Sequence, residues 1–240
     1  MMNLTQHKMK NILLIGGSYG IGLEIAKELQ NDTNVFVASR TNENLSGLKV
    51  THIPFDVMTD SLQSADLPTV IDGLVYCPGS INLRPFRGLK IETFEADMQL
   101  NFFSMIKIVQ SILPQLTASE QSSIVLFSTV AVKMGMPFHT SVAASKGAIE
   151  GFAKALAAEY APKIRVNVVA PSLTDTPLAE KFLSNDDKRE KSAQRHPLKR
   201  FGTTQDIAQM TNFLLSDKSS WISGQVFSVD GGMSTLLVNG

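Results

Sequence analysis

Short runs of apolar, largely β-branched residues alternate along this chain with longer segments whose apolar positions recur at helical spacing. The apolar runs are NILLI at 11–15, VFVA at 35–38, GLVY at 73–76, IVLFS at 124–128 and RVNVVA at 165–170. The helical segments span 20–30, 91–115, 142–161 and 204–216. Strands without polar alternation are buried on both faces, which is typical of a parallel sheet covered by helices. The pattern therefore predicts an α/β fold, a doubly wound sheet of the Rossmann type.

The length and composition fit one domain. With 240 residues, 43% of them hydrophobic, the chain can bury one large core, so we expect a single domain over residues 1–240. A charged stretch bounded by prolines, Pro177 to Pro197, interrupts the alternation. It follows a predicted strand end, where ligands bind in such sheets. We therefore interpret residues 174–200 as a substrate lid.

The charge balance and the single cysteine exclude several classes of partner and site. Lys and Arg number 22 and Asp and Glu also number 22, so no overall field favours nucleic acid or an anionic membrane. Cys77 is the only cysteine, which rules out an internal disulfide and a multi-cysteine metal site. No stretch is apolar enough for a signal peptide or an anchor. We expect a cytoplasmic protein that binds no metal and acts on a small molecule.

A glycine-rich turn directly follows the first apolar run. It reads Gly16-Gly17-Ser18-Tyr19-Gly20-Ile21-Gly22 and leads into the first helical segment. Glycines let the backbone approach a pyrophosphate closely, and a helix N-terminus presents free amide groups to it. A plain strand-to-helix turn is the alternative, but strand, glycines and helix come in the order that dinucleotide binding requires. We expect Gly16, Ser18, Tyr19, Gly20, Ile21 and Gly22 to bind a dinucleotide.

The end of the second apolar run indicates which coenzyme binds. An acidic residue there would accept the ribose 2′-hydroxyl of NAD, but the chain has Ser39-Arg40. A guanidinium pairs well with a 2′-phosphate, and no carboxylate is present to repel it. An ordinary surface arginine is the alternative. The pair favours NADP(H).

These motifs and later ones resemble the short-chain dehydrogenase/reductase family over nearly the whole chain. Within that family the RVNVVAP run, Arg200-Phe201-Gly202 and Val229-Asp230-Gly231-Gly232 are most similar to 3-oxoacyl-acyl-carrier-protein reductases. The resemblance implies about seven parallel strands with helices on both faces. It also implies that further residues line the coenzyme, namely Asp56, Val57, Cys77, Gly79, Lys146, Pro171, Thr174 and Thr176.

The resemblance also implies a catalytic set in which one member is missing. The family's asparagine, serine, tyrosine and lysine align with Asn101, Thr129, Val142 and Lys146. Thr129 keeps a hydroxyl that can donate to a carbonyl oxygen, but Val142 has no proton to give. Since a positioned general acid contributes about 10² to 10⁴ in rate, the chemistry has either moved to another residue or been lost.

His139 is the candidate replacement donor. It lies seven residues before Lys146, the spacing at which the enoyl reductases of the same fold place their active tyrosine. An unperturbed imidazole titrates near neutral pH, as proton donation requires. A polar loop residue without a chemical role is the alternative. Tyr19 and Tyr76 are two further phenols near the predicted coenzyme site, and packing or coenzyme contact is the expected role for both.

Two functions from different classes remain open. The first is an NADP(H)-dependent oxidoreductase acting on a small-molecule carbonyl, a conjugated carbonyl or an acyl thioester, for which basic residues of the lid could form a receptive rim. The second is a catalytically silent NADP(H)-binding protein or the partner subunit of a mixed oligomer. The segments at 96–116 and 148–161 carry enough apolar and small residues for a core face and a partner face, so we expect a homodimer or homotetramer.

Overall fold

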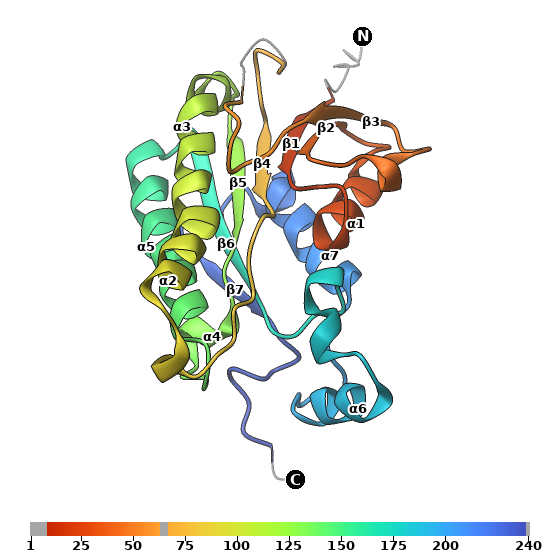
Figure 1. Cartoon of the computed structure of the whole chain (residues 1–240). Helices are drawn as coiled ribbons and strands as arrows, with labels where there is room; N and C mark the ends of the chain where they lie inside the picture. The colour runs from red at the N-terminus through yellow and green to blue at the C-terminus, as the bar shows by residue number, and fades with distance from the viewer. Residues whose placement is uncertain (1–8, 63–66, 239–240) are drawn as a thin grey trace.

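The computed structural model describes residues 9–62 and 67–238. Residues 1–8, where the sequence predicts no leader, lie outside the described part, as do 63–66 and 239–240. The described chain forms one α/β unit around a single sheet, with helices on both faces (Figure 1). The predicted Rossmann-type architecture is confirmed.

All seven strands of the sheet run parallel. Their order is β3-β2-β1-β4-β5-β6-β7. The chain therefore adds β2 and β3 on one side of β1, crosses back, and adds β4 to β7 on the other side. This reversal between β1 and β4 is the topological switch point, where ligands bind in such sheets. The strands are β1 (Asn11–Ile15), β2 (Asn34–Ser39), β3 (Val50–Pro54), β4 (Gly73–Tyr76), β5 (Ser122–Phe127), β6 (Ile164–Pro171) and β7 (Val226–Val229).

The helices cover the sheet in two groups. Figure 1 shows α3 and α5 on one face and α1 and α7 on the other, while α6 stands apart from the sheet. The helices are α1 (Gly20–Leu29), α2 (Ile91–Met98), α3 (Ser104–Thr117), α4 (Val130–Lys133), α5 (Thr140–Tyr160), α6 (Asp186–Gln194) and α7 (Thr204–Leu215). The predicted helices at 20–30, 142–161 and 204–216 match α1, α5 and α7 to within two residues.

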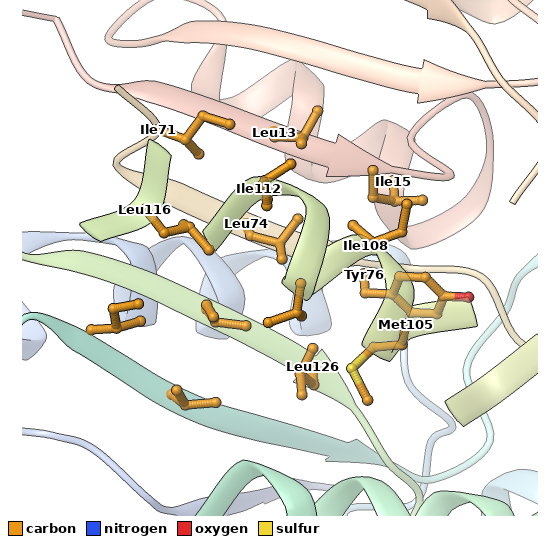
Figure 2. Close-up of a cluster of buried hydrophobic side chains, with 14 of the residues drawn as sticks. Leu13, Ile15, Ile71, Leu74, Tyr76, Met105, Ile108, Ile112, Leu116 and Leu126 are labelled. Carbon is orange, nitrogen blue, oxygen red and sulfur yellow. The ribbon is translucent and has the colours of Figure 1, made fainter. Parts of the chain in front are cut away.

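Successive residues of the buried strands supply two separate cores. In β1, Leu13 and Ile15 face one side of the sheet, and Ile12 and Leu14 face the other. Figure 2 shows the first core, in which strand side chains meet Met105, Ile108, Ile112 and Leu116 of α3. Because both faces of the inner strands β1, β4 and β5 are covered, their sequences are largely apolar, which explains the missing polar alternation.

The helix predicted at 91–115 contains a change of geometry. It runs as α2, then a π-helical stretch at Gln99–Phe103, then α3. A π turn leaves backbone groups poorly matched, and the hydroxyl of Tyr76 donates to the Leu100 carbonyl at 2.7 Å. Tyr76 is 2% exposed and belongs to the core of Figure 2. Packing, rather than proton donation to a substrate, therefore accounts for Tyr76.

The predicted lid at 174–200 is mostly helical. It contains a 3₁₀ segment, Pro177–Phe182, followed by α6. Parallel pairing of Thr174 with Gly202 brings the two ends of the lid together.

Among the described residues, no helix combines the length and the apolarity needed to cross a membrane. No cluster of three or more metal-ligating side chains occurs among those residues either.

Candidate active site

A cavity of about 1040 Å³ opens where the strands end at the switch point. Residues at or just after the ends of β1, β2, β4, β5 and β6 form its floor, and the lid contributes one wall. The carboxyl ends of parallel strands share one edge of the sheet, so segments far apart in sequence meet there. The cavity brings together every residue that the sequence predicts to contact a coenzyme: Gly16, Ser18, Tyr19, Gly20, Ile21, Gly22, Ser39, Arg40, Asp56, Val57, Cys77, Gly79, Lys146, Pro171, Thr174 and Thr176.

The glycine turn forms a close-packed cradle at the start of α1. Gly16 and Gly20 have φ of 77° and 58°, a region that favours glycine. A Cβ on Gly22 would lie 2.7 Å from the Gly16 carbonyl oxygen, so no side chain fits there without moving the turn. No side chain caps the first turn of α1, and no acidic residue lies in it. The turn therefore fits the pyrophosphate of a dinucleotide.

The end of β2 offers one free cation to the cavity. Ser39 is buried and its hydroxyl donates to the Thr41 carbonyl at 2.8 Å. The Arg40 side chain is exposed, lines the cavity, and forms no hydrogen bond or ion pair with any described residue. Thr41, which the sequence analysis did not single out, also lines the cavity and lies 3.1 Å from the Ser18 hydroxyl. The Arg40 guanidinium is thus available for a phosphate.

Lys146 holds a buried ammonium group at the centre of the site. Its Nζ donates to the Phe127 carbonyl at 3.0 Å. Burial lowers the pKa of Lys146 to about 8, while Cys77 and Asp97 oppose part of that shift. A Cβ built on Gly79 would lie 3.3 Å from both Lys146 Nζ and Asn101 Oδ1. These two polar groups therefore face the same narrow space beside Gly79.

Lys146→Met should stabilise the fold at neutral pH. A pKa of about 8 in the folded protein, against 10.5 in a free side chain, means that folding opposes the charged form below pH 8. This penalty is about 3 kcal/mol and disappears as pH rises from about 8 to 10.5. After loss of the bond to Phe127, we expect a gain of about 1–3 kcal/mol in the free energy of unfolding at pH 7. Urea unfolding at pH 7 and pH 9.5 tests this, and an equal gain at both values contradicts the buried-charge explanation.

The residues aligned with the catalytic set lie together, but their roles differ. Thr129 and Val142 line the cavity with Lys146, whereas Asn101 is fully buried behind them. Thr129 Oγ1 accepts from the Ala131 amide at 3.3 Å, which leaves its proton free to donate. The Asn101 amide nitrogen donates to Ser145 Oγ at 2.9 Å and to Ser80 Oγ at 3.1 Å. Asn101 therefore reaches the cavity through Ser80.

His139 lines the same cavity as Val142. It precedes α5 directly, and its Nδ1 lies 2.7 Å from the Pro137 carbonyl oxygen. A carbonyl can only accept, so this contact places a hydrogen on Nδ1. The other ring nitrogen, Nε2, has no hydrogen-bond partner among the described residues. The geometry thus leaves one ring nitrogen of His139 available to a ligand.

A buried carboxylate that the sequence analysis missed anchors the wall behind Val142. Asp97 is 1% exposed and accepts three hydrogen bonds, from Ser80 Oγ at 2.5 Å, Asn82 Nδ2 at 2.6 Å and Ser141 Oγ at 2.6 Å. Ser141 directly precedes Val142 on α5. This hydrogen-bonded group, which we call the Asp97 cluster, gives the carboxylate the partners that burial requires.

A serine–histidine pair that the sequence did not predict lies where the end of β6 meets the lid. Ser172 Oγ lies 2.8 Å from His196 Nε2, and His196 Nδ1 lies 2.8 Å from the Ser192 carbonyl oxygen. The carbonyl fixes the hydrogen on Nδ1, so the Ser172 hydroxyl donates to Nε2. Both residues line the cavity, and His196 is 3% exposed. The sequence offered one signal, the hydroxyl-bearing Ser172 directly after the predicted coenzyme residue Pro171.

Known proteins of similar sequence and fold match most of this chain. A family model described as enoyl-(acyl carrier protein) reductase matches residues 16–234. The 3-oxoacyl-acyl-carrier-protein reductase FabG of Chlamydia trachomatis is 31% identical over 94% of this chain and 97% of its own length. A short-chain type dehydrogenase/reductase from Mycobacterium ulcerans has 25% identity and a TM-score of 0.83, covering 94% of this chain and 90% of that one.

The solved structures also include ElxO with coenzyme. ElxO is 26% identical, with coverage of 95% of this chain and 100% of that one. It is known with NADP bound at a TM-score of 0.86, and a tyrosine-to-phenylalanine variant is known with NADPH bound at a TM-score of 0.87.

Proposed function

The chain belongs to the short-chain dehydrogenase/reductase family, and we propose that it is an NADP(H)-dependent oxidoreductase that reduces a carbonyl or conjugated carbonyl compound of the 3-oxoacyl kind. One observation carries this proposal: the glycine cradle, the free Arg40 and the buried Lys146 line a single cavity. A nicotinamide coenzyme held there would supply the hydride. The remaining volume and the lid wall would receive the substrate.

The choice of NADP(H) rests on Arg40 and on the lack of an acid at the end of β2. Asp56 is the only described acidic residue that lines the cavity, and its Oδ1 already accepts from the Met58 amide at 2.9 Å. A phosphate beside Arg40 would therefore gain a charge-assisted hydrogen bond. ElxO, with NADP or NADPH bound, supports the same choice.

Arg40→Asp should weaken NADPH binding about 10- to 100-fold and leave NADH binding nearly unchanged. Losing a hydrogen bond to a charged group costs about 1.5–3 kcal/mol, and each 1.4 kcal/mol is tenfold in affinity. Titration of reduced-nicotinamide fluorescence measures both dissociation constants. Lys49→Asp makes the same charge change at an exposed position outside the cavity and serves as the control. Equal affinity of the unmodified protein for the two coenzymes would refute the preference.

We infer that Val142 occupies the position of the family's catalytic tyrosine, so that this chain must take the proton from another residue. We propose that Thr129 donates a hydrogen bond to the substrate oxygen and that the doubly protonated, cationic ring of His139 supplies the proton from Nε2, leaving the neutral ring with its hydrogen on Nδ1. His196 offers a second imidazole in the same cavity, already engaged with Ser172. Of the two, His139 is nearer in sequence to Val142 and has a ring nitrogen without a partner, which favours it.

Val142 itself favours the second candidate function, an NADP(H)-binding protein without turnover or the silent subunit of a mixed oligomer. Coenzyme binding does not need the missing hydroxyl, as the NADPH-bound ElxO variant indicates for one of its tyrosines. In such a protein the cavity would bind NADP(H) as a sensor of its concentration, or another subunit of the oligomer would catalyse the reaction.

One experiment separates the two functions. The purified chain is mixed with NADPH and a series of 3-oxoacyl thioesters and enones, and coenzyme oxidation is followed together with product formation. Oxidation matched by an equal amount of reduced product establishes the oxidoreductase. Tight NADPH binding without product formation, for a chain that gains turnover on Val142→Tyr, establishes the silent binder.

We also propose a homodimer or homotetramer built on α3 and α5. Phe103, which directly precedes α3, is a large apolar side chain that is 47% exposed in the single chain. Sedimentation of the native protein measures the state.

A further inference from the structure

The lid helix α6 divides its charges between two sides. Lys188, Lys191 and Arg195, spaced i, i+3 and i+7, line the cavity together with Lys181 from the preceding 3₁₀ segment. This spacing places them on one face of the helix. The lid's acidic residues do not line the cavity: Asp175, Glu180, Asp186, Asp187 and Glu190. Among the basic side chains of α6, only Arg189 lies off the cavity with the acidic ones.

The four cavity-facing cations have no acidic partner. Within the described chain, no carboxylate lies at ion-pair distance from any of them, although the neighbouring Arg189 pairs with Asp175 at 2.6 Å. The ammonium group of Lys181 donates to the Ile81 carbonyl at 3.2 Å, and that of Lys188 donates to the Lys181 carbonyl at 3.0 Å. These hydrogen bonds hold both side chains in place. Like charges at these spacings repel, so an anion in the cavity would relieve the repulsion.

Packing does not explain the orientation of α6. Its sequence, DDKREKSAQ, has no apolar stripe, and only Ser192 is buried. A helix without an apolar face gains little free energy from lying against the body, so its cationic face is not a by-product of core formation. Arg40, which we assign to the coenzyme, lies at the end of β2, whereas these cations belong to the lid wall.

We propose that the substrate carries its own anionic group, a carboxylate or a phosphate, which the lid binds through Lys191 and Arg195 with Lys181 and Lys188 beside them. This inference rests on the proposed function, because it assumes that a carbonyl compound enters the cavity. It adds a substrate class: oxo acids or carbonyl compounds bearing phosphate are preferred over neutral ketones of the same size.

Calorimetry on the protein saturated with NADP⁺ tests this without requiring turnover. The probes are 4-oxopentanoate, its neutral methyl ester and acetoacetyl-coenzyme A, which distinguish a carboxylate from phosphates. We expect an anionic probe to bind at least tenfold more tightly than the ester. In the double variant Lys191→Gln/Arg195→Gln, this ratio should fall about tenfold or more, with ester affinity unchanged. The control, Lys49→Gln/Lys199→Gln, makes the same charge change at residues that do not line the cavity.

The outcomes separate this inference from the proposed function. Selective anion binding that the double variant abolishes supports the lid site even if no NADPH is consumed. Turnover without preference for an anion overturns the lid site and leaves the oxidoreductase intact. Weaker NADPH binding in the double variant, with no change in the anion-to-ester ratio, would assign the cations to the coenzyme phosphates and overturn the proposal.

Discussion

Val142→Tyr should raise the rate of NADPH-dependent carbonyl reduction about 10²- to 10⁴-fold, the range that a positioned general acid contributes. Val142 lies one helical turn before Lys146 on α5, and both line the cavity. A phenol at that position would therefore project into the substrate space near the buried ammonium, which favours the ionised phenol and so lowers its pKa. Thr129, on the same cavity, can still donate to the substrate oxygen. The measurement is the initial rate of NADPH oxidation with a 3-oxoacyl thioester.

Two further variants make this result interpretable. Val142→Phe adds the ring without the hydroxyl and should give no gain; a gain equal to that of tyrosine would mean that bulk, not proton donation, was missing.

His139→Ala tests the replacement donor in the unmodified chain. Any basal turnover should fall in that variant, whereas unchanged turnover removes His139 from the mechanism and leaves His196 as the remaining imidazole.

Gly22→Ala should weaken NADPH binding about 100-fold or more. The added Cβ would lie 2.7 Å from the Gly16 carbonyl oxygen and 2.9 Å from Gly17 Cα, distances that real Cβ atoms do not adopt. Both contacts are backbone atoms, so the glycine turn itself must move. Because we propose that backbone amides of this turn bind the pyrophosphate, a shift of this size would disrupt several hydrogen bonds at once. Fluorescence titration with NADPH measures the loss, and thermal unfolding checks that the variant remains folded.

Gly88→Ala is the matched control. Its Cβ would meet nothing within 4 Å, and Gly88 does not line the cavity, so NADPH affinity should stay at the unmodified level. A folded Gly22→Ala protein that binds NADPH as tightly as this control would show that the turn is not the pyrophosphate site.

The sheet and the coenzyme half of the cavity could be predicted because their signals are local. Each buried strand is a short apolar run, and the glycine turn follows β1 directly. Once the strands are known to be parallel, their carboxyl ends must share an edge, which gathers Ser39, Asp56 and Pro171 without further information.

The chemical half of the cavity could not be predicted in the same way, since it depends on contacts between distant segments. Asp97 lies in IETFEADM, a segment that resembles an ordinary surface helix, yet it is bound by Ser141, 44 residues later. The partner of Ser172 is 24 residues away, across the lid. The π turn at Gln99–Phe103, which adjoins the buried Asn101, likewise has no signature in spacing or composition.

The Asp97 cluster fixes the side of the cavity behind Val142. The Asp97 carboxylate on α2 is hydrogen-bonded to the loop that holds Ser80 and Asn82 and to Ser141 on α5. These bonds fix the three segments relative to one another on this side of the cavity. A shift of any one of these segments would leave the buried Asp97 carboxylate without a hydrogen-bond partner, which is costly. The two histidines that line the cavity lie outside this hydrogen-bonded group: His139 directly precedes α5, and His196 follows α6.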